Sequence, residues 1–414
     1  ESSVPKKVGD LMQAFNAESP LTDPPSLLSN FGDTWCLFYG VGNHGGGPTK
    51  EHIQQIQRIA KDPTLPALLF GTTQHFFEQV NAKPHPPNGH IPNWNDDLQL
   101  NAPGCYTAHS GIKKLNRQSE HLLMQAERLS SLATLRLGAE YPAAELREAW
   151  EHVCFNHFHD IICGVAIRQA LEEATEMYGH ALHAARKATR YAVQRIARNI
   201  NTNGEGVALL LFNHHSWRLQ EPATVELWHD IDKSLWSQPV QISLRDHEGN
   251  DLPCQLGFTS GKIGKDRIAV TFQSDVPAFG WRLYRLLYGQ PSPHAAIRGN
   301  VMEREGIIHV ENAHLRIAIS SQNGCLTELY HKESGIHFLQ GAAACGLVIS
   351  DDSDTWGHGV VAFDHVLGVF DKAEVRLVEN GPTHITVRSL TRFGASWLQQ
   401  DFRIRRFEQE CLRP

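Results

Sequence analysis

Helical periodicity runs almost without interruption from residue 105 to residue 200, and this stretch constrains the fold more than any other feature of the sequence. Apolar residues recur in it every three or four positions, which gives each helix one buried stripe. Pro142 is the one proline within it, so a helix is expected to end there. The pattern predicts three helices that pack as a bundle, at 107–137, 143 to about 162, and 166–200.

The residues before this stretch alternate between short apolar runs and amphipathic segments. Apolar runs at 35–39 and 67–70 are typical of buried strands, and the segments 49–60 and 73–80 have helical periodicity. The order strand, helix, strand, helix predicts a parallel sheet with covering helices. A segment rich in proline at 84–89 then predicts a linker.

From residue 204 onward the sequence changes to short strand-like runs separated by Gly, Asn and Asp turns. Strands are expected at 207–212, 268–272, 310–319 and 385–390. This pattern predicts an antiparallel β-sandwich. The chain ends shortly after a strand-like run, so we expect this domain to be incomplete. The predicted fold class is multidomain, with an α/β part, an all-α part and an all-β part in that order.

The composition is that of an ordinary globular protein, with 41% hydrophobic and 20% charged residues. The formal charge of −7 and the lack of basic blocks argue against nucleic acid and anionic membranes as partners. No apolar run approaches the roughly 18 residues that a membrane span needs. The chain opens at Glu1 without a Met or a signal peptide, so we expect that a segment precedes it.

The numbers and positions of cysteine and histidine indicate less about the protein than the helical pattern does. The eight cysteines form no CxxC pair, which predicts reduced, mostly packed thiols and favours a cytoplasmic location. They stand at positions 36, 105, 154, 163, 254, 325, 345 and 411. Histidine accounts for 24 of 414 residues, which favours metal or sugar chemistry without placing it.

A glycine-rich loop at 40–45 matches the GxGxxG pattern of dinucleotide sites. Such a site needs an acidic residue at the end of the next strand, and residues 70–73 supply none. The same loop approaches a P-loop, but Pro48 stands where a lysine must reach the phosphates. Nucleotide binding is therefore disfavoured. The loop is either a structural turn or a glycine run that lets His44 approach a polar ligand closely.

The segment 150–164 is expected to be helical and to present histidines. His157 and His159 would point about 200° apart on one helix, so they could not share a metal ion. His152 and His159 would share a face but lie about 10 Å apart, too far for one ion. This helix can therefore deliver one histidine to a metal. Asp160 follows directly, and a helical His-Asp pair is by itself typical of surface or capping chemistry.

Three segments, taken in order, resemble glycoside hydrolase family 38, the α-mannosidases. They are residues 39–49, Gly104-Cys105-Tyr106-Thr107-Ala108-His109, and Phe155-Asn156-His157-Phe158-His159-Asp160-Ile161-Ile162-Cys163-Gly164. The second segment continues through Lys113, Asn116-Arg117, Glu120 and Ala126-Glu127. Leu211-Phe212-Asn213 then opens a β domain, and weaker similarity extends to about residue 400.

The resemblance implies three domains: the C-terminal part of a β/α barrel with a linker at 1–100, a three-helix bundle at 101–203, and a truncated β-sandwich at 204–414. It also implies retaining hydrolysis of terminal α-mannosides with zinc as cofactor. The implied substrate is a mannose-containing oligosaccharide or glycoside. A homo-oligomer is possible on this resemblance.

The resemblance further implies roles for individual residues. His159 matches the zinc ligand of the family, and Asp160 matches the aspartate that contacts the hydroxyls of bound mannose. Tyr106 lies in the aromatic segment beside the sugar site and is a substrate-binding candidate. His44 is a further substrate-binding candidate from the glycine loop.

The sequence departs from the family pattern before and within these segments. Ala102-Pro103 stand where many relatives have His-Arg, so the resemblance implies no contacts from these two positions. The other zinc ligands and the nucleophilic aspartate of the family precede the glycine loop, and Asp10, Asp23 and Asp33 lie in no such motif. We therefore expect the nucleophile upstream of this chain and no activity from the chain alone.

The alternative interpretation is a non-catalytic carbohydrate-binding or scaffold protein. One further segment bears on sugar binding. The loop 351–358 contains three aspartates, a tryptophan and a histidine. It is either a solvated turn or part of the sugar site, since a tryptophan beside Asp and His suits stacking on a sugar.

Overall fold

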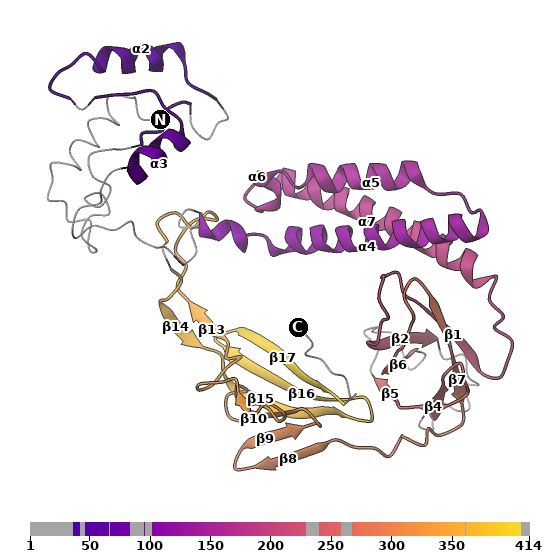
Figure 1. The fold of residues 1–414 in the computed structure, drawn as a ribbon. Coiled ribbons are helices and arrows are strands. Elements are labelled where there is room, and N and C mark those ends of the chain that lie inside the picture. The colour runs from indigo at the N-terminus through magenta and orange to yellow at the C-terminus, as the bar shows by residue number, and fades with distance from the viewer. Residues whose placement is uncertain are drawn as a thin grey trace. The chain divides into compact units, whose positions relative to one another are not determined.

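The computed structural model describes residues 36–41, 46–65, 67–82, 95, 102–228, 240–257, 267–360 and 362–406. The chain divides into two compact units, Glu1–Leu98 and Gln99–Pro414, and each is described by itself (Figure 1). His44 and the expected linker at 84–89 lie outside the described residues.

Two helices are described in the first unit, α2 (Lys50–Ile59) and α3 (Thr73–Ala82). α2 begins after Thr49, whose hydroxyl accepts a hydrogen bond from the His52 amide and so caps the helix. The buried side chain of α2 is Ile56. It packs against a small set of partly buried apolar residues, Leu37, Tyr39, Ile59 and Leu68. Both helices lie where their periodicity predicts them.

The two strands expected in this unit are not formed in its described part. Residues 36–39 and 67–70 have no regular secondary structure and take part in none of the described sheets. Phe38 and Leu69, which a covered parallel sheet would bury, are 73% and 83% exposed. The prediction of a parallel sheet was therefore wrong for these residues, because an apolar run becomes a strand only where a neighbouring strand satisfies its backbone groups.

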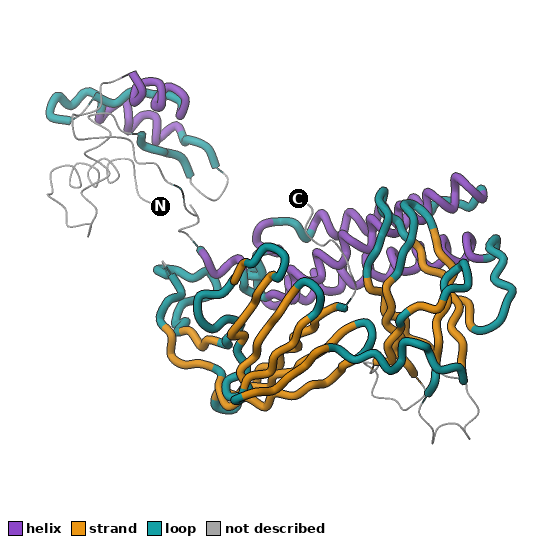
Figure 2. Tube along the Cα trace, turned by 60° about the horizontal axis from the view of Figure 1, so that its bottom comes forward, coloured by secondary structure: helices purple, strands orange, loops and turns teal. Residues whose placement is uncertain are grey.

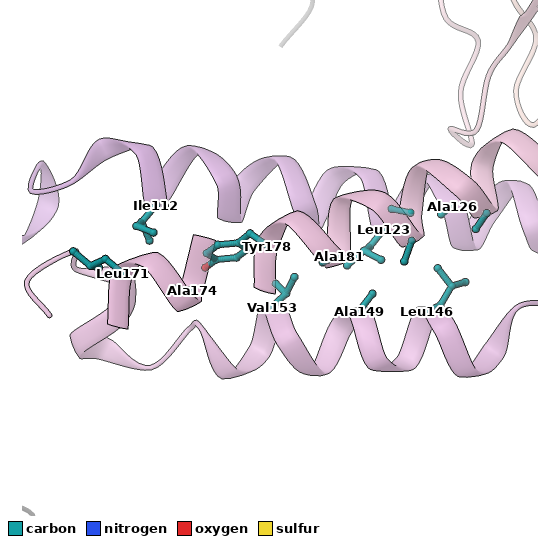
Figure 3. Packing of buried hydrophobic residues seen from close by; sticks show 13 residues of the cluster. Ile112, Leu123, Ala126, Leu146, Ala149, Val153, Leu171, Ala174, Tyr178 and Ala181 are labelled. Atoms are coloured by element: carbon teal, nitrogen blue, oxygen red, sulfur yellow. The ribbon is translucent and has the colours of Figure 1, made fainter. Parts of the chain in front are cut away.

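Three long helices of the second unit share one apolar core (Figure 3). They are α4 (Ser110–Leu137), α5 (Ala143–Phe155) and α7 (Arg168–Ala197). α4 ends at Gly138, whose left-handed backbone lets its amide reach back to the last carbonyl groups of the helix. The core is rich in alanine, which lets the helices approach closely: Ile112, Leu123, Ala126, Leu146, Ala149, Val153, Leu171, Ala174, Tyr178, Ala181, Ala184, Ala185 and Ala188.

The second of these helices is shorter than the periodicity predicts. α5 ends at Phe155, and a separate short helix, α6 (His159–Ile162), follows. Asn156 lies in the break with its side chain fully buried, and its Nδ2 donates to the Ala174 carbonyl, 3.3 Å away in α7. Phe158 then has an extended backbone, with φ −53° and ψ 133°. The prediction of one continuous helix to about residue 162 was wrong because this tertiary contact stops it.

All described strands lie in the second unit, and every described pairing is antiparallel. In chain order they are β1 (Val207–Phe212), β2 (Pro222–Trp228), β3 (Ile242–Arg245), β4 (Asp251–Leu252), β5 (Cys254–Gly257), β6 (Arg267–Gln273), β7 (Trp281–Tyr288), β8 (Asn300–Arg304), β9 (Ile307–Glu311), β10 (Leu315–Ser320), β11 (Leu326–His331), β12 (Ile336–His337), β13 (Leu347–Ile349), β14 (Val366–Val369), β15 (Asp371–Asn380), β16 (His384–Phe393) and β17 (Ser396–Arg405).

The strands form two groups (Figure 2). Each group has its own apolar core. In the first group the sheets β1-β7-β3-β4 and β2-β6-β5 pack around buried residues that include Leu244, Phe272 and Leu286. In the second group the sheets β12-β11-β10-β9-β8 and β15-β16-β17 share a core that includes Val310 and Ile385. A separate two-stranded sheet pairs β13 with β14. Helices followed by several antiparallel sheets agree with the coarse fold class predicted from the sequence.

Two local expectations need correction. The strand predicted at 310–319 is two strands, because the Asn312 side chain accepts hydrogen bonds from the amides of His314 and Leu315 and turns the chain between β9 and β10. Cys325 and Cys345 form a disulfide, so the expectation of reduced thiols was wrong at this pair.

Among the described residues, no helix combines the length and the apolar character that crossing a membrane requires.

Candidate active site

His157 has a side chain that is 42% exposed, and its ring contacts polar side chains of α4. Its Nε2 lies 2.9 Å from Oδ1 of Asn116 and 3.3 Å from Oε1 of Glu120. The Tyr178 hydroxyl donates to the same Asn116 oxygen, 3.2 Å away. Burial, with a smaller contribution from Glu120, raises the pKa of Tyr178 to about 12, so this hydroxyl stays protonated and remains a donor. His157 is therefore part of a structural network.

His159 opens α6 and lies outside that network. Its side chain is 76% exposed and that of Asp160 is 48% exposed, with 3.5 Å between Nε2 of His159 and Oδ1 of Asp160. The Phe158 ring lies beside the imidazole, with 4.4 Å between the ring centroids. The pair thus presents a nitrogen and a carboxylate oxygen on the surface of the second unit, and the described residues do not enclose them.

Tyr106 ends a short 3₁₀ helix, η3 (Pro103–Tyr106), and is 62% exposed. The residues that flank this segment, Ala102 and His109, have left-handed backbones with φ of 55° and 49°. Such conformations are unfavourable for residues with a Cβ and persist only where the surrounding structure fixes them. The segment is therefore held in one conformation by its contacts.

Lys113 and Gly164 join the Tyr106 segment to the end of α6. The Lys113 ammonium donates to the Ala108 carbonyl at 2.7 Å and to the Cys163 carbonyl at 2.9 Å. Gly164 has a left-handed backbone with φ of 75°, and a Cβ added there would lie 2.5 Å from the Ala108 oxygen. A glycine is thus required for this approach. These contacts bring together two segments that the sequence singled out separately.

Two thiols lie at this junction, on Cys105 and Cys163. Burial raises the pKa of Cys105, and interactions with Cys163, including a side-chain hydrogen bond, raise it further. Asp160 adds a smaller contribution in the same direction. Burial also lowers the pKa of Lys113. The junction is therefore a partly desolvated group of ionisable side chains, a feature typical of functional sites.

The loop 351–358 docks on the same segment. The Gly104 amide donates to the Trp356 carbonyl, 3.1 Å away. The Trp356 and His358 rings are stacked, with centroids 6.0 Å apart and planes 13° apart. Nδ1 of His358 lies 2.6 Å from Oδ2 of Asp354, and this hydrogen bond is the main cause that lowers the pKa of Asp354. The loop is thus ordered by its own polar contacts and by Gly104.

The described residues supply part of a zinc site and no more. Zinc in proteins takes about four N, S or O ligands, and His159 with Asp160 offers one nitrogen and one carboxylate. Among the residues that the structure describes, no group of three or more His, Cys, Asp or Glu side chains could hold a metal ion. The pair therefore fits zinc as a partial donor set, and the remaining ligands would have to lie outside the described residues.

A cavity of about 730 Å³ opens on the α7 side of the junction. His109, Gly164, Thr355 and the first turns of α7 contribute to its lining, which includes Arg168 and Glu172. Neither Tyr106 nor the His159-Asp160 pair lines this cavity. Thr355 of the loop 351–358 lines this cavity, so the cavity borders the junction without including the three exposed candidate side chains.

The structure also identifies residues to which sequence reasoning gave no role. Lys113 is within the family-like segment, but a lysine on an amphipathic helix is by default a solvated residue. Cys163 precedes the glycine that ends the segment, and its position in the motif gives no sign of the contact that its carbonyl makes. A local signal existed for Lys113 alone, since it lies one helical turn from the start of α4 and can reach back to a preceding carbonyl. The Gly164 contact depends on tertiary structure.

Two family models match consecutive parts of the chain. Residues 3–97 match the N-terminal domain of glycosyl hydrolases family 38, and residues 103–196 match the α-mannosidase middle domain. The chain is therefore a relative of the α-mannosidases of glycoside hydrolase family 38, as the sequence predicts.

Individual relatives are similar over different lengths. Human alpha-mannosidase 2C1 is 34% identical over 141 residues, which cover 34% of this chain and 13% of that protein. Alpha-mannosidase G of Dictyostelium discoideum is 23% identical over 384 residues, covering 85% of this chain and 33% of that protein. The chain thus spans about a third or less of these curated relatives.

Solved structures show the same fold. The crystal structure of an α-mannosidase from Enterococcus faecalis V583 superposes with a TM-score of 0.53, at 17% sequence identity. The match covers 83% of this chain and 42% of that one.

Proposed function

We propose that this chain contributes the substrate-facing end of the helical domain to an α-mannosidase that hydrolyses terminal α-mannosides with retention of configuration. The observation that carries the proposal is the junction of two distant segments, one bearing Tyr106 and the other His159 and Asp160. Lys113 and Gly164 hold these segments together. The substrate would be a mannose-containing oligosaccharide or glycoside, and the cytoplasm is the compartment that the sequence predicts.

The side chains at this junction suit the binding of a sugar. The Tyr106 ring can lie against the apolar face of a pyranose, and the Asp160 carboxylate can accept hydrogen bonds from two neighbouring hydroxyls. Both side chains are exposed enough to reach a ligand. Trp356 and His358 belong to the loop that docks at Gly104, and we propose that this loop borders the same sugar site.

His159 is proposed as one ligand of a zinc ion that also contacts the sugar. Its ring is exposed and, among the described residues, contacts Asp160 and Phe158, so it can reach a metal ion. Bound zinc would orient the hydroxyls of the sugar and stabilise negative charge beside it. A ligating imidazole nitrogen must be unprotonated, so metal binding should weaken in acid.

The domain layout inferred from the resemblance is proposed on the same grounds. Residues 1–100 would belong to a β/α barrel, 101–203 to a three-helix bundle and 204–414 to a β-sandwich part. Retaining hydrolysis needs two carboxyl groups about 5 Å apart, and we assign neither role to a described residue. We therefore expect the 414-residue chain by itself to leave an aryl α-mannoside unhydrolysed.

The test is metal content and turnover in the complete gene product. The wild-type protein should bind zinc and release the retained anomer from an aryl α-mannoside, as followed by NMR. His159→Ala should lose both zinc and turnover. Asp160→Asn should keep the metal better than His159→Ala does, because the His159 imidazole stays in place, but it should bind the sugar more weakly because the carboxylate charge is lost.

His121→Ala is the matched control, because His121 is an exposed histidine on α4, away from the junction. It should leave zinc content and turnover unchanged. Unaltered zinc content in His159→Ala would refute the ligand assignment. A wild-type protein that binds mannosides without hydrolysing them would favour the alternative, a non-catalytic carbohydrate-binding protein.

A further inference from the structure

A second cavity, of about 590 Å³, lies at the end of the helical part that is remote from α6 and the junction (Figure 1). It is bounded by the last turns of α4, by residues 139–145 that lead into α5, and by the second half of α7. None of the described residues that line it belongs to the family-like segments. The cavity is therefore separate from the candidate active site.

The floor of this cavity is apolar and made of small side chains. Tyr141 and Tyr191 add two aromatic side chains to the lining. Small residues leave open a volume that larger apolar residues would fill, and such a floor suits a flat apolar ring. Four alanines line the cavity and are at most 8% exposed: Ala133 in α4, and Ala184, Ala188 and Ala192 in α7.

The Ser130 hydroxyl is a buried polar group in this lining. Ser130 is 4% exposed, and its Oγ has no hydrogen-bond partner among the described residues. A buried hydroxyl without a partner lowers stability, because the hydrogen bonds that it made to water are not replaced. A ligand that places a hydroxyl group in the cavity would supply the missing partner.

Cations predominate on the part of α7 that borders the cavity. Residues 177–197 contain no acidic residue, but they contain Arg186, Lys187, Arg190 and Arg195. Lys187 and Arg195 line the cavity itself. Lys187 also lines an adjoining cavity of about 460 Å³, to which Arg186 and Arg190 contribute. This side of the cavity therefore has a positive potential that favours an anionic group.

The acidic side chains at the cavity do not neutralise all of these cations. Glu140 and Glu145 line the cavity, and Oε1 of Glu145 lies 4.0 Å from Nζ of Lys187. Arg195 is exposed and takes part in no ion pair within the described part of the chain. Its guanidinium can therefore pair with a carboxylate.

We propose that this cavity binds a small aromatic acid that carries a hydroxyl group at the end opposite its carboxylate. The ring lies on the alanine floor, the hydroxyl group exchanges a hydrogen bond with Oγ of Ser130, and the carboxylate pairs with Arg195. The volume of the cavity is within the range of about 300–1,000 Å³ that is usual for small-molecule sites. The proposal does not depend on the mannosidase function.

The experiment compares three probes with the 414-residue chain at pH 7, by titration followed with ligand-observed saturation-transfer NMR. The probes are 4-hydroxyphenylacetate, phenylacetate, which lacks the hydroxyl group, and 4-hydroxyphenylacetamide, which lacks the charge. The first should bind with one saturable Kd, and the other two should each bind more weakly. Failure of all three to bind saturably, or equal affinity for all three, would overturn the proposal.

Ser130→Ala tests the hydrogen bond at the floor. It should weaken the binding of 4-hydroxyphenylacetate about 3–10-fold and leave the affinity for phenylacetate unchanged. Ser119→Ala is the matched control, because Ser119 is also a fully buried serine of α4 with an unpartnered Oγ, but it does not line the cavity. This control should leave both affinities unchanged. Equal weakening by the two variants would count against the site.

Arg195→Met tests the charge at the opening. It should weaken the binding of both acids about 2–5-fold at low salt and leave the affinity for the uncharged amide unchanged. Arg147→Met is the control, because Arg147 is an exposed arginine of α5 that does not line the cavity. It should leave all three affinities unchanged. Unchanged binding of the acids in Arg195→Met would refute the assignment of an anionic ligand.

Discussion

The backbone amide of Gly104 donates to the carbonyl oxygen of Trp356 across 3.1 Å, and no side chain could be added at this contact. A Cβ at position 104 would lie 2.6 Å from the Thr355 oxygen and 2.9 Å from the Gly357 nitrogen. These are backbone atoms, which cannot rotate away as a side chain can. The glycine therefore sets how closely the loop 351–358 approaches the Tyr106 segment.

We expect Gly104→Ala to separate this loop from the Tyr106 segment. The added methyl group must displace the backbone at 355–357, which costs about 1–3 kcal/mol by comparison with other overpacked sites. Hydrogen exchange measured by mass spectrometry should show faster exchange of the amides at 351–358. Gly179→Ala is the matched control, since no atom lies within 4 Å of its added Cβ in α7. It should stabilise the helix by about 0.5–1 kcal/mol.

Alanine substitutions of the two histidines in the family-like motif should change the stability of the protein by different amounts. His157→Ala removes the imidazole that lies 2.9 Å from the Asn116 oxygen, so it should lower the stability of the helical part by about 1–2 kcal/mol. His159→Ala removes an exposed ring and should change stability by less than about 0.5 kcal/mol. Urea unfolding followed by the helical circular dichroism signal provides the measurement. Equal losses from both variants would contradict the assignment of His157 to structure.

The helices could be predicted closely because their determinants are local. The apolar periodicity places α4 and α7 within a few residues of their observed bounds. The end of α5 could not be predicted, because Asn156 stops the helix through a hydrogen bond to Ala174 in another helix. The consequence is functional as well as structural. With the break, the His157 ring contacts Asn116 in α4 and α6 begins at His159. In one continuous helix, the helical geometry would have fixed the directions of both side chains.

Strand positions were predictable where an apolar run pairs with a neighbour, as in β1, whose observed bounds are those predicted. They were not predictable at 67–70, where the same kind of run finds no partner among the described residues. The candidate site was likewise predictable in one part and not in another. His159 and Asp160 follow from a motif, but the Lys113 bridge depends on a contact between Lys113 and Cys163, far apart in the sequence.

Removal of the Lys113 ammonium should loosen the junction. Lys113→Met keeps the aliphatic stem but removes both hydrogen bonds, leaving two partly buried carbonyl groups without this donor. We expect a loss of about 1–3 kcal/mol and faster amide exchange at 159–164. Lys114→Met is the control, because Lys114 is exposed on the same helix. Unchanged exchange at 159–164 in Lys113→Met would show that Gly164 packing alone holds the segments together.

A buried ionisable pair connects the two groups of strands and should make them sensitive to acid. Nε2 of His384 lies 2.9 Å from Oε2 of Glu379 and 3.3 Å from Nε2 of Gln255 in β5. Burial lowers the pKa of His384 below its ordinary value of 6.5, and Glu379 only partly offsets this. Burial tends to raise the pKa of Glu379, but hydrogen bonds with Thr386 and His384 outweigh it and lower the pKa below 4.5.

Both shifts act in the same direction. A group whose pKa is lowered by folding binds fewer protons in the folded state than in the unfolded state, so stability falls as pH decreases. The stability contributed by His384 should be fully present above about pH 6.5 and be lost as pH falls through its folded-state pKa. The stability contributed by Glu379 should be lost in the same way below about pH 4.5.

His384→Gln should therefore flatten the pH dependence of the unfolding free energy below pH 6.5, measured by urea titration at a series of pH values. His121→Gln is the control, because His121 is exposed on α4, and it should leave the pH dependence of the unfolding free energy as in the wild type. If His384→Gln keeps the wild-type pH dependence, the acid sensitivity comes from other groups.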